Sequence, residues 1–321
     1  MSSEKNDRLE AAARAGWLYY VAGENQDRIA AILGVSRPSA QRLVALAVSA
    51  GLVRVRIEHP LARSLDLARA LTDRFGLSFC EVAPTDPLSD STTLGVAQPI
   101  ADQLEKRLRA ETPTLIGVGT GRTLKAAAEL LPRIDCPQHK VVSLTGAIGP
   151  DGAAAYYNVI FILADRLSAP AYPLPVPVVA SSAEERDLLH RQPTIRSALE
   201  MAARLDVAFL GVGEFDERAP LFMDRFISAG ERDSMRAAGA VGELIGWAFD
   251  REGVWIEGGS NARVAGAPPP RPEGGRLVIG CAMGARKLPA VGGALKGRLL
   301  NGLIVDEAMA EGLLKGPWAP G

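Results

Sequence analysis

The sequence predicts a two-part chain of the α/β class, in which a small helical unit precedes a larger unit built on a parallel sheet. The chain has 321 residues, enough for two domains. Up to about residue 57, apolar residues recur mainly at helical spacing. From about residue 77 onward, short apolar runs alternate with helical segments. Several of these runs lead directly into glycine, which favours a doubly wound, Rossmann-like sheet.

The composition indicates a globular protein without a bound metal. Hydrophobic residues make up 47% and charged residues 23% of the chain, so it can bury a sizeable core. The net charge is −1, which means that any contact with nucleic acid has to come from a local basic patch. The three cysteines and three histidines share no ligand spacing, and we expect no metal, disulfide or cofactor. No apolar run approaches the roughly 18 residues of a membrane span, so we expect a soluble, cytoplasmic protein.

Three segments follow one another along the chain. Residues 1–58 are expected to form a winged helix-turn-helix domain, residues 59–76 a linker helix, and residues 77–321 an α/β domain that binds a small effector. The strands that we expect in the α/β domain are Thr114–Val118, Lys140–Leu144, Val207–Val212, Val254–Glu257 and Leu277–Gly280. The proline- and glycine-rich stretch 265–275 is expected to be a surface loop.

The helix-turn-helix is predicted from the residues that start and stop its two helices. A first helix ends at Gly34, which permits a tight turn, and Ser36 is a suitable N-cap for a second helix with Pro38 in its first turn. The second helix exposes basic and amide side chains, and the run 52–57 then alternates apolar residues with arginine, as a wing would. The candidate DNA-contacting residues are Gln26, Ser36, Arg37, Ser39, Gln41, Arg42, Arg54 and Arg56.

A plain helical hairpin with solvated arginines is the alternative interpretation of this segment. The charge pattern argues against it, because no acidic residue lies between Arg28 and Glu58, whereas four arginines do. The preceding helix, from about residue 7 to residue 21, is expected to place Trp17 and Tyr20 in the core of the same unit.

A glycine-rich loop at 114–123, TLIGVGTGRT, predicts an anion or hydroxyl site. A strand, a glycine loop and a helix N-terminus together present backbone N–H groups and the positive end of the helix dipole to a ligand. Arg122 and Lys125 would reinforce a phosphate there. The loop lacks the third glycine of a dinucleotide site and the Gly-Lys-Ser/Thr ending of a P-loop. A turn that merely packs the strand against the helix is the alternative.

Other glycine-rich strand ends occur at 144–149, 210–215 and 280–287. In open α/β sheets the loops at the carboxyl ends of the strands converge on one crevice. Carboxylates, an amide and a lysine lie near these loops or on the following helices, and such groups suit a polyhydroxylated ligand. The candidate effector-binding residues are Gly119, Thr120, Gly121, Arg122, Thr123, Asn158, Gly213, Glu214, Glu243, Asp250 and Lys287.

Ordered matches along nearly the whole chain resemble the SorC family of sugar-responsive regulators, also grouped with the DeoR type. The motifs that carry the resemblance are QxxIAxxLGVSR at 26–37, GVGTGRT at 117–123, Asn158, GVG at 211–213, GAVGEL at 239–244, FD at 249–250, Lys287, ALKGRLLN at 294–301 and LIVDE at 303–307. One departure occurs before Lys287, where AMGAR stands in place of the family's paired glycine.

The resemblance implies a DNA-binding transcriptional regulator of a carbohydrate or polyol operon. It also implies an effector domain similar in fold to sugar-phosphate isomerases and deaminases, and a homo-oligomer, either a tetramer or a dimer. Its partners would be double-stranded operator DNA and a sugar, sugar phosphate or polyol, with the effector in the pocket formed by the candidate residues above.

An isomerase or deaminase with an added N-terminal domain is the rival interpretation. The loop at 117–123 is close to the phosphate loop of such enzymes. However, the strand end at 211–217, GVGEFDE, lacks the acidic run that supplies their catalytic groups, and general acid–base catalysis needs such a carboxylate. We therefore expect no enzyme activity.

Overall fold

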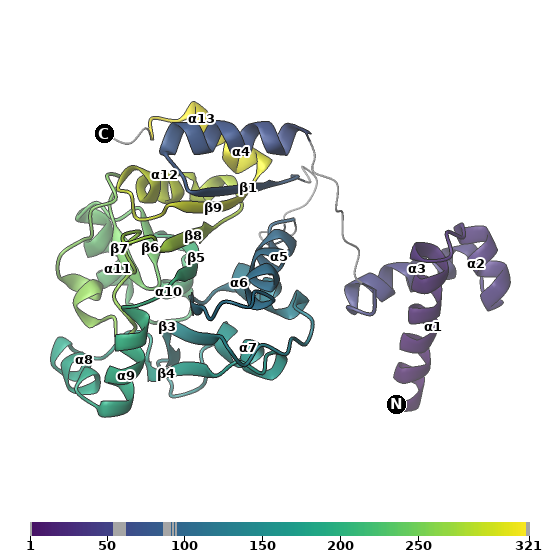
Figure 1. Ribbon diagram of the computed structural model, residues 1–321, viewed down its shortest axis with the longest axis horizontal. Coiled ribbons are helices and arrows are strands. Elements are labelled where there is room, and N and C mark those ends of the chain that lie inside the picture. The colour runs from purple at the N-terminus through teal and green to yellow at the C-terminus, as the bar shows by residue number, and fades with distance from the viewer. Residues whose placement is uncertain (1, 54–61, 86–90, 92, 94, 319–321) are drawn as a thin grey trace. The chain divides into compact units, whose positions relative to one another are not determined.

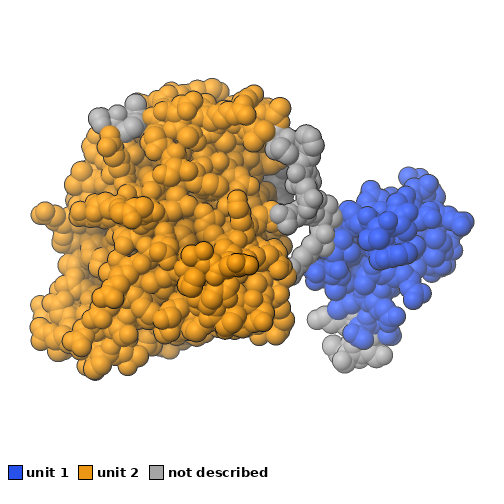
Figure 2. Space-filling view, viewed as in Figure 1, with its two compact units in different colours: residues 1–60 blue, residues 61–321 orange. Residues whose placement is uncertain are grey.

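The computed structural model describes residues 2–53, 62–85, 91, 93 and 95–318 (Figure 1). The chain divides into two compact units, residues 1–60 and residues 61–321, called unit 1 and unit 2 (Figure 2). A helical region therefore precedes a sheet-containing region, which agrees with the predicted α/β class.

The described part of unit 1 consists of α1 (Ser2–Tyr20), α2 (Gln26–Leu33) and α3 (Arg37–Ser49). The Asn25 side chain accepts a hydrogen bond from the Arg28 N–H at 2.9 Å and caps the start of α2. The helix ends at Gly34, whose φ of 65° lies in the left-handed region that glycine tolerates. The Ser36 hydroxyl then accepts the Ser39 N–H at 3.4 Å and caps α3. Two helices joined by the turn 34–36 form the predicted helix-turn-helix.

The core of unit 1 is small and made of short side chains. Its buried members are Ala15, Leu18, Ile29, Ala30, Ala40 and Val44. The prediction that Trp17 and Tyr20 belong to this core is wrong, because these side chains are 55% and 41% exposed. The buried positions of α1 are instead Ala12, Ala15 and Leu18, which recur every third residue and so share one face.

Unit 2 is built on a parallel sheet with the strand order β1-β9-β8-β5-β2-β3-β4. An antiparallel hairpin of β6 and β7 extends from β5. The strands are β1 (Phe79–Ala83), β2 (Leu115–Val118), β3 (Lys140–Ile148), β4 (Ala171–Pro177), β5 (Val207–Glu214), β6 (Gly242–Leu244), β7 (Trp247–Phe249), β8 (Leu277–Cys281) and β9 (Gly302–Asp306).

Four of the five predicted strands are confirmed as β2, β3, β5 and β8. The fifth, over residues 254–257, is wrong. Trp255 forms only an isolated bridge with Phe249, and the Ile256 N–H donates to the Ala248 carbonyl at 3.0 Å. The segment thus turns back along β7 instead of joining the parallel sheet, which leaves Val254 exposed.

Helices cover both faces of the sheet (Figure 1). One face carries α5 (Ala97–Leu108), α6 (Arg122–Leu130) and α7 (Val159–Arg166), which bury Ile100, Leu124 and Leu163 against it. The other face carries α4 (Ala62–Phe75), α9 (Pro193–Ala202), α12 (Leu288–Lys296) and α13 (Glu307–Lys315). Shorter elements lie in the connections: α8 (Ala183–His190), α10 (Pro220–Met223), α11 (Ala229–Ala237), and the 3₁₀ turns η1 (Gly259–Arg263) and η2 (Ala285–Lys287).

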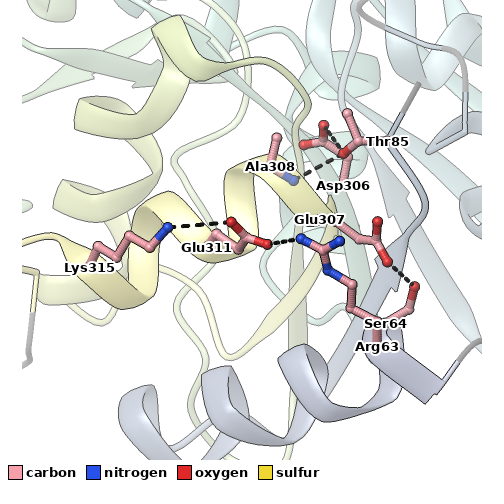
Figure 3. A network of polar contacts seen from close by, with 8 residues as sticks. All are labelled: Arg63, Ser64, Thr85, Asp306, Glu307, Ala308, Glu311 and Lys315. Carbon is pink, nitrogen blue, oxygen red and sulfur yellow. Dashed lines mark hydrogen bonds and ion pairs between the residues drawn. The ribbon is translucent and has the colours of Figure 1, made fainter. Parts of the chain in front are cut away.

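The helix that we expected as a linker over residues 59–76 is α4, and it packs within unit 2. Its Leu71 and Phe75 are buried in the core on that face of the sheet. Figure 3 shows polar contacts that hold α4 to α13: Arg63 pairs with Glu311, and the Ser64 hydroxyl donates to Glu307 Oε1 at 3.0 Å. The helix is therefore an integral part of the effector-side unit and not a free spacer.

Substitution of Phe209 tests the assignment of the sheet core, because this side chain is fully buried on β5, near the middle of the strand order. We expect Phe209→Ala to lower the free energy of unfolding by about 3–5 kcal/mol, since it removes apolar burial and leaves a cavity. Urea denaturation at a fixed protein concentration measures this change. Phe161→Ala on α7 is the matched control, because Phe161 is 50% exposed and should lose less than about 1 kcal/mol. Equal losses for the two variants would contradict this core assignment.

Candidate DNA-reading surface and effector cavity

Helix α3 presents polar and basic side chains on its exposed side. Arg37, Gln41 and Arg42 are exposed, while Ala40 and Val44 face the core. The Arg42 guanidinium donates to the Ser39 hydroxyl at 3.2 Å and to the Pro38 carbonyl at 3.3 Å. These contacts hold the guanidinium close to the first turn of α3, the end of a recognition helix that meets base edges.

Two of the other predicted DNA contacts differ from Arg42 in their surroundings. Arg37 forms an ion pair with Asp27 at 3.4 Å, in which both side chains are 66% exposed. A pair this exposed contributes little to stability and leaves Arg37 available to a stronger anion. Gln26 is the first residue of α2 and is half-buried. Arg54 and Arg56, the arginines of the predicted wing, lie outside the described residues.

The candidate effector cavity lies where the order of the strands reverses. From β2 the chain continues to β3 and β4 on one side of the sheet, whereas β5, on the other side of β2, is followed by β8 and β9. The loops that leave β2 and β5 therefore diverge and open a crevice at the carboxyl ends of these strands. The loop after β2 contributes Thr120, Gly121 and Arg122 to this crevice, and the end of β5 contributes Glu214.

An outer chamber of about 560 Å³ is lined by charged side chains from the connections after β2, β5 and β8, and by Tyr157 from the connection after β3. Its residues are Arg122, Tyr157, Glu214, Arg218, Pro220, Met223, Asp224, Met283, Gly284, Ala285, Arg286 and Lys287. Lys287 Nζ lies 4.0 Å from Glu214 Oε2, and Arg286 lies 2.6 Å from Asp216 and 3.8 Å from Glu214. Four cations and two carboxylates line the chamber, so positive charge is in excess.

A smaller inner chamber of about 80 Å³ adjoins the outer one. Its residues are Thr120, Gly121, Thr145, Ala155, Tyr156, Tyr157, Val178, Gly211, Pro220, Leu221, Asp224, Phe226, Glu243, Ile245 and Gly246. The Thr120 hydroxyl donates to the Tyr157 carbonyl, which joins the loop after β2 to the segment before α7. Glu243 Oε2 accepts the Gly246 N–H at 2.7 Å, and this bond fixes the carboxyl at the chamber wall.

Gly213 on β5 permits the position of Glu243 on β6, with which it pairs in register. A Cβ atom at residue 213 would lie 2.0 Å from Glu243 Oε1, a distance at which two heavy atoms clash. The predicted site residue Gly213 therefore acts through the space that it leaves for the Glu243 carboxyl.

Burial shifts the titration of Glu243 in the inner chamber and of Lys287 in the outer chamber. Burial raises the pKa of Glu243 to about 7, although the Gly246 N–H and Lys287 act in the opposite direction. Burial also lowers the pKa of Lys287, while Glu214 and Glu243 oppose this shift. By solvent exposure Glu243 is only half-buried, because the residue opens onto the chamber, but protein atoms surround its carboxyl group.

Not all of the predicted effector residues reach the cavity. Asn158 Nδ2 donates to the Ala147 carbonyl at 3.1 Å, and Asp250 Oδ1 accepts the N–H groups of Glu252 and Val254 at 2.9 Å. These two side chains form hydrogen bonds with backbone groups of nearby loops. Neither of them lines the chambers that the described residues form.

Within the loop after β2 the predicted residues have different roles. The Gly119 N–H donates to the Phe209 carbonyl at 2.9 Å, and Thr123 is buried under the first turn of α6. Lys125, which we expected to reinforce a phosphate, pairs with Glu129 one turn further along α6. Gly119, Thr123 and Lys125 are thus absent from the cavity lining described above, which leaves Thr120, Gly121 and Arg122 as the loop's contribution.

Several lining residues were not predicted, and some of them had a signal in the sequence. Thr145 lies in the glycine-rich strand end at 144–149, and Arg286 precedes the predicted Lys287. Arg218 and Asp224 follow β5 in the loop that begins at the predicted Glu214. Tyr157 has no signal of its own, because its place at the cavity depends on the path of the segment between β3 and α7.

Comparisons with known proteins agree with this architecture. A family model described as "Putative sugar-binding domain" matches residues 59–315. The erythritol catabolism regulatory protein EryD of Brucella abortus is 34% identical over 306 residues, which cover 95% of this chain and 96% of EryD. Transcriptional regulator LsrR of Klebsiella pneumoniae is 31% identical over 312 residues, which cover 95% of this chain and 93% of LsrR. The crystal structure of the full-length sorbitol operon regulator SorC from Klebsiella pneumoniae superposes with a TM-score of 0.70 at 25% identity, covering 96% of this chain and 99% of SorC.

Fold, cavity and matches together define a transcriptional regulator with a sugar-binding effector domain. The chain belongs to the SorC/DeoR family of sugar-binding transcriptional regulators, which confirms the resemblance drawn from its motifs. It is a regulator and not an isomerase or deaminase, because the relatives that match over its whole length are regulators. None of the helices in the described residues is long and apolar enough to cross a membrane.

The raised pKa of Glu243 predicts a specific dependence of stability on pH. Because the folded-state pKa exceeds the unfolded value of about 4.5, the contribution to stability is fully present below pH 4.5 and is lost as the pH rises through 7. We expect Glu243→Gln, which cannot ionise, to reduce the fall in stability between pH 5 and pH 8 by up to about 3 kcal/mol. Urea denaturation of both proteins across this range measures the difference. Parallel pH profiles would show that Glu243 titrates normally.

Proposed function

We propose that unit 1 binds operator DNA through the exposed side of α3, and that an anionic sugar or polyol bound in the cavity of unit 2 controls this binding. The observation that carries the proposal is the placement of an excess of cations beside hydroxyl and carboxyl groups in one crevice at the reversal of the sheet. Such a crevice suits a small ligand with both hydroxyls and a negative charge.

DNA binding is supported by the form of unit 1 and by the chemistry of α3. Arginine and glutamine side chains pair with base edges in the major groove, and serine hydroxyls bind phosphate. Arg42 and Gln41 are exposed on α3, and Ser36 lies at its N-terminus. Operators are read as paired half-sites, so we propose a homo-oligomer, a tetramer or a dimer, that acts in the cytoplasm where the operator lies.

An anionic effector is supported by the outer chamber. Arg122, Arg218, Arg286 and Lys287 line it, and the guanidinium groups can bind phosphate or carboxylate through paired hydrogen bonds. The relatives named after erythritol catabolism and the sorbitol operon favour a polyol skeleton for the remainder of the ligand. The class that fits both observations is a polyol or open-chain sugar with a terminal phosphate or carboxylate.

Control of DNA binding requires that the effector distinguish two arrangements of the oligomer. A ligand shifts such an equilibrium only by its difference in affinity for the two states. We propose that the effector changes the arrangement of the subunits and thereby the spacing of the α3 helices relative to the half-sites.

Arg42 tests the DNA-reading surface. We expect Arg42→Ala to weaken binding to an operator selected from random DNA by the wild-type protein, by tenfold or more, because one base or phosphate contact is lost. Fluorescence anisotropy at fixed salt measures the affinity, and Arg196→Ala on α9 is a control for loss of an exposed arginine. Unchanged operator affinity for Arg42→Ala would remove α3 from the interface.

Arg122 tests the charge of the effector. We expect Arg122→Ala to weaken binding of polyol phosphates by roughly tenfold, with a smaller effect on the corresponding neutral polyols. Isothermal titration calorimetry of a panel of four- to six-carbon polyols and their phosphates measures both affinities. Lys125→Ala is the matched control, because Lys125 lies one turn along the same helix and pairs with Glu129 outside the cavity. Equal losses for neutral and phosphorylated ligands would argue against an anionic effector.

A further inference from the structure

The two chambers of the effector cavity differ in chemistry. The outer chamber carries the four cations, whereas no lysine, arginine or histidine lines the inner chamber among the described residues. The inner chamber has hydroxyl and carboxyl groups set among apolar side chains such as Val178, Phe226 and Ile245. Tyr157, Pro220 and Asp224 line both chambers, so that one ligand can extend from one into the other.

Thr145 is the most unusual side chain of the inner chamber. It lies on β3, it is 2% exposed, and its hydroxyl has no hydrogen-bond partner within the described chain. The backbone of the same residue is satisfied, because its N–H donates to the Ser143 hydroxyl at 3.4 Å and its carbonyl accepts from that hydroxyl at 2.8 Å. A buried hydroxyl left without a partner costs free energy, and a ligand hydroxyl would remove this cost.

Glu243 supplies the second polar group of the inner chamber. The Gly246 N–H donates to its Oε2, whereas its Oε1, which lies over Gly213, accepts no hydrogen bond from the described residues. Because burial brings its pKa to about 7, the carboxyl can either donate or accept a hydrogen bond near neutral pH. Both directions suit a hydroxyl group, which is itself a donor and an acceptor.

We propose that the inner chamber binds a hydroxyl-bearing end of the effector, that Thr145 is the residue that selects for this hydroxyl, and that the charged end stays in the outer chamber. This inference rests on the proposed function, and it adds the orientation of the ligand and a residue that sets specificity.

Size and charge both support this orientation. The inner chamber has the volume of a few water molecules, each of which takes up roughly 30 Å³ in the liquid, so it has room for a hydroxymethyl or carbinol group. Its two carboxyl side chains are those of Glu243 and Asp224, and burial raises the pKa of both. A phosphate placed there would lie against two carboxyl groups with no cation in the described lining, which is unfavourable, whereas the outer chamber offers it four cations against two carboxylates.

The test compares Thr145→Val, which replaces the hydroxyl with a methyl group of similar size, with Thr145→Ser, which keeps the hydroxyl. The probes are the four- to six-carbon polyols, their terminal phosphates, and the monodeoxy analogues of whichever probe binds best. Calorimetric titration of the full chain measures affinity, and thermal unfolding without ligand reports on folding. Thr194→Val is the matched control, because Thr194 is exposed on α9.

We expect Thr145→Val to bind the best probe at least tenfold more weakly, while Thr145→Ser and Thr194→Val bind it like the wild type. One monodeoxy analogue should bind the wild type with the same reduced affinity that the parent probe shows for Thr145→Val. The affinity of this analogue should be no lower for Thr145→Val than for the wild type. This pattern identifies a single hydroxyl that Thr145 recognises.

Two results would overturn the inference while leaving the proposed function intact. If Thr145→Val binds every probe as tightly as the wild type does, water and not the ligand fills the inner chamber. If the substitution weakens the binding of the parent probe and of all its deoxy analogues equally, it only disturbs packing. If no polyol or polyol phosphate binds the wild-type chain, the proposed function is itself wrong and the inference falls with it.

Discussion

The reversal of strand order between β2 and β5 is the constraint on which the site depends. Every other feature of the cavity follows from two loops that leave neighbouring strands in opposite directions. The loop after β2 brings a glycine turn and Arg122, and the end of β5 brings Glu214. A sheet that continued in one direction would have covered this edge with a helix connection and left no space for a ligand.

The hairpin of β6 and β7 adds a buried carboxyl to this crevice. Gly213 makes room for Glu243 beside β5, and the Gly246 N–H holds the carboxyl from within the same hairpin. Burial of a charge is costly unless it is paired or neutralised, and here Lys287 and the raised pKa share that role. The cavity is thus polarised, because all of its cations line the outer chamber and none of the described lysines, arginines or histidines lines the inner one.

The sequence predicted the central part of the fold better than its edges. β2, β3, β5 and β8 have the long apolar character of strands covered on both faces, and they were found. β4 was missed because AYPLPVP contains three prolines, which only an edge strand tolerates, and β4 is an edge strand of the sheet. β9, GLIVD, has only three apolar side chains in a row, and such a short run cannot be distinguished by periodicity from a buried helix turn.

The sequence predicted the position of the cavity at the strand ends, but only some of the residues predicted to line it do so. Strand-end glycine loops indicated the crevice, because the topology rule applies without knowledge of side-chain packing. Asp250 and Asn158 were assigned to it as polar residues near such loops, but their side chains satisfy backbone groups locally. Thr145 and Arg218 lie in or next to segments that the sequence indicated, but which side chain of each segment lines the cavity depends on how segments far apart in the chain meet.

The pairing of α4 with α13 has a consequence for the stability of the first helix of unit 2. α4 is the first helix of unit 2 after unit 1, and the contacts of Arg63 and Ser64 with Glu311 and Glu307 anchor its opening turn to a helix from the other end of that unit (Figure 3). Leu288, which directly follows Lys287 of the cavity lining, packs closely on Gly312 of α13. A fusion tag or truncation that disturbs α13 would therefore loosen the start of α4, even though no described residue of α13 lines the cavity.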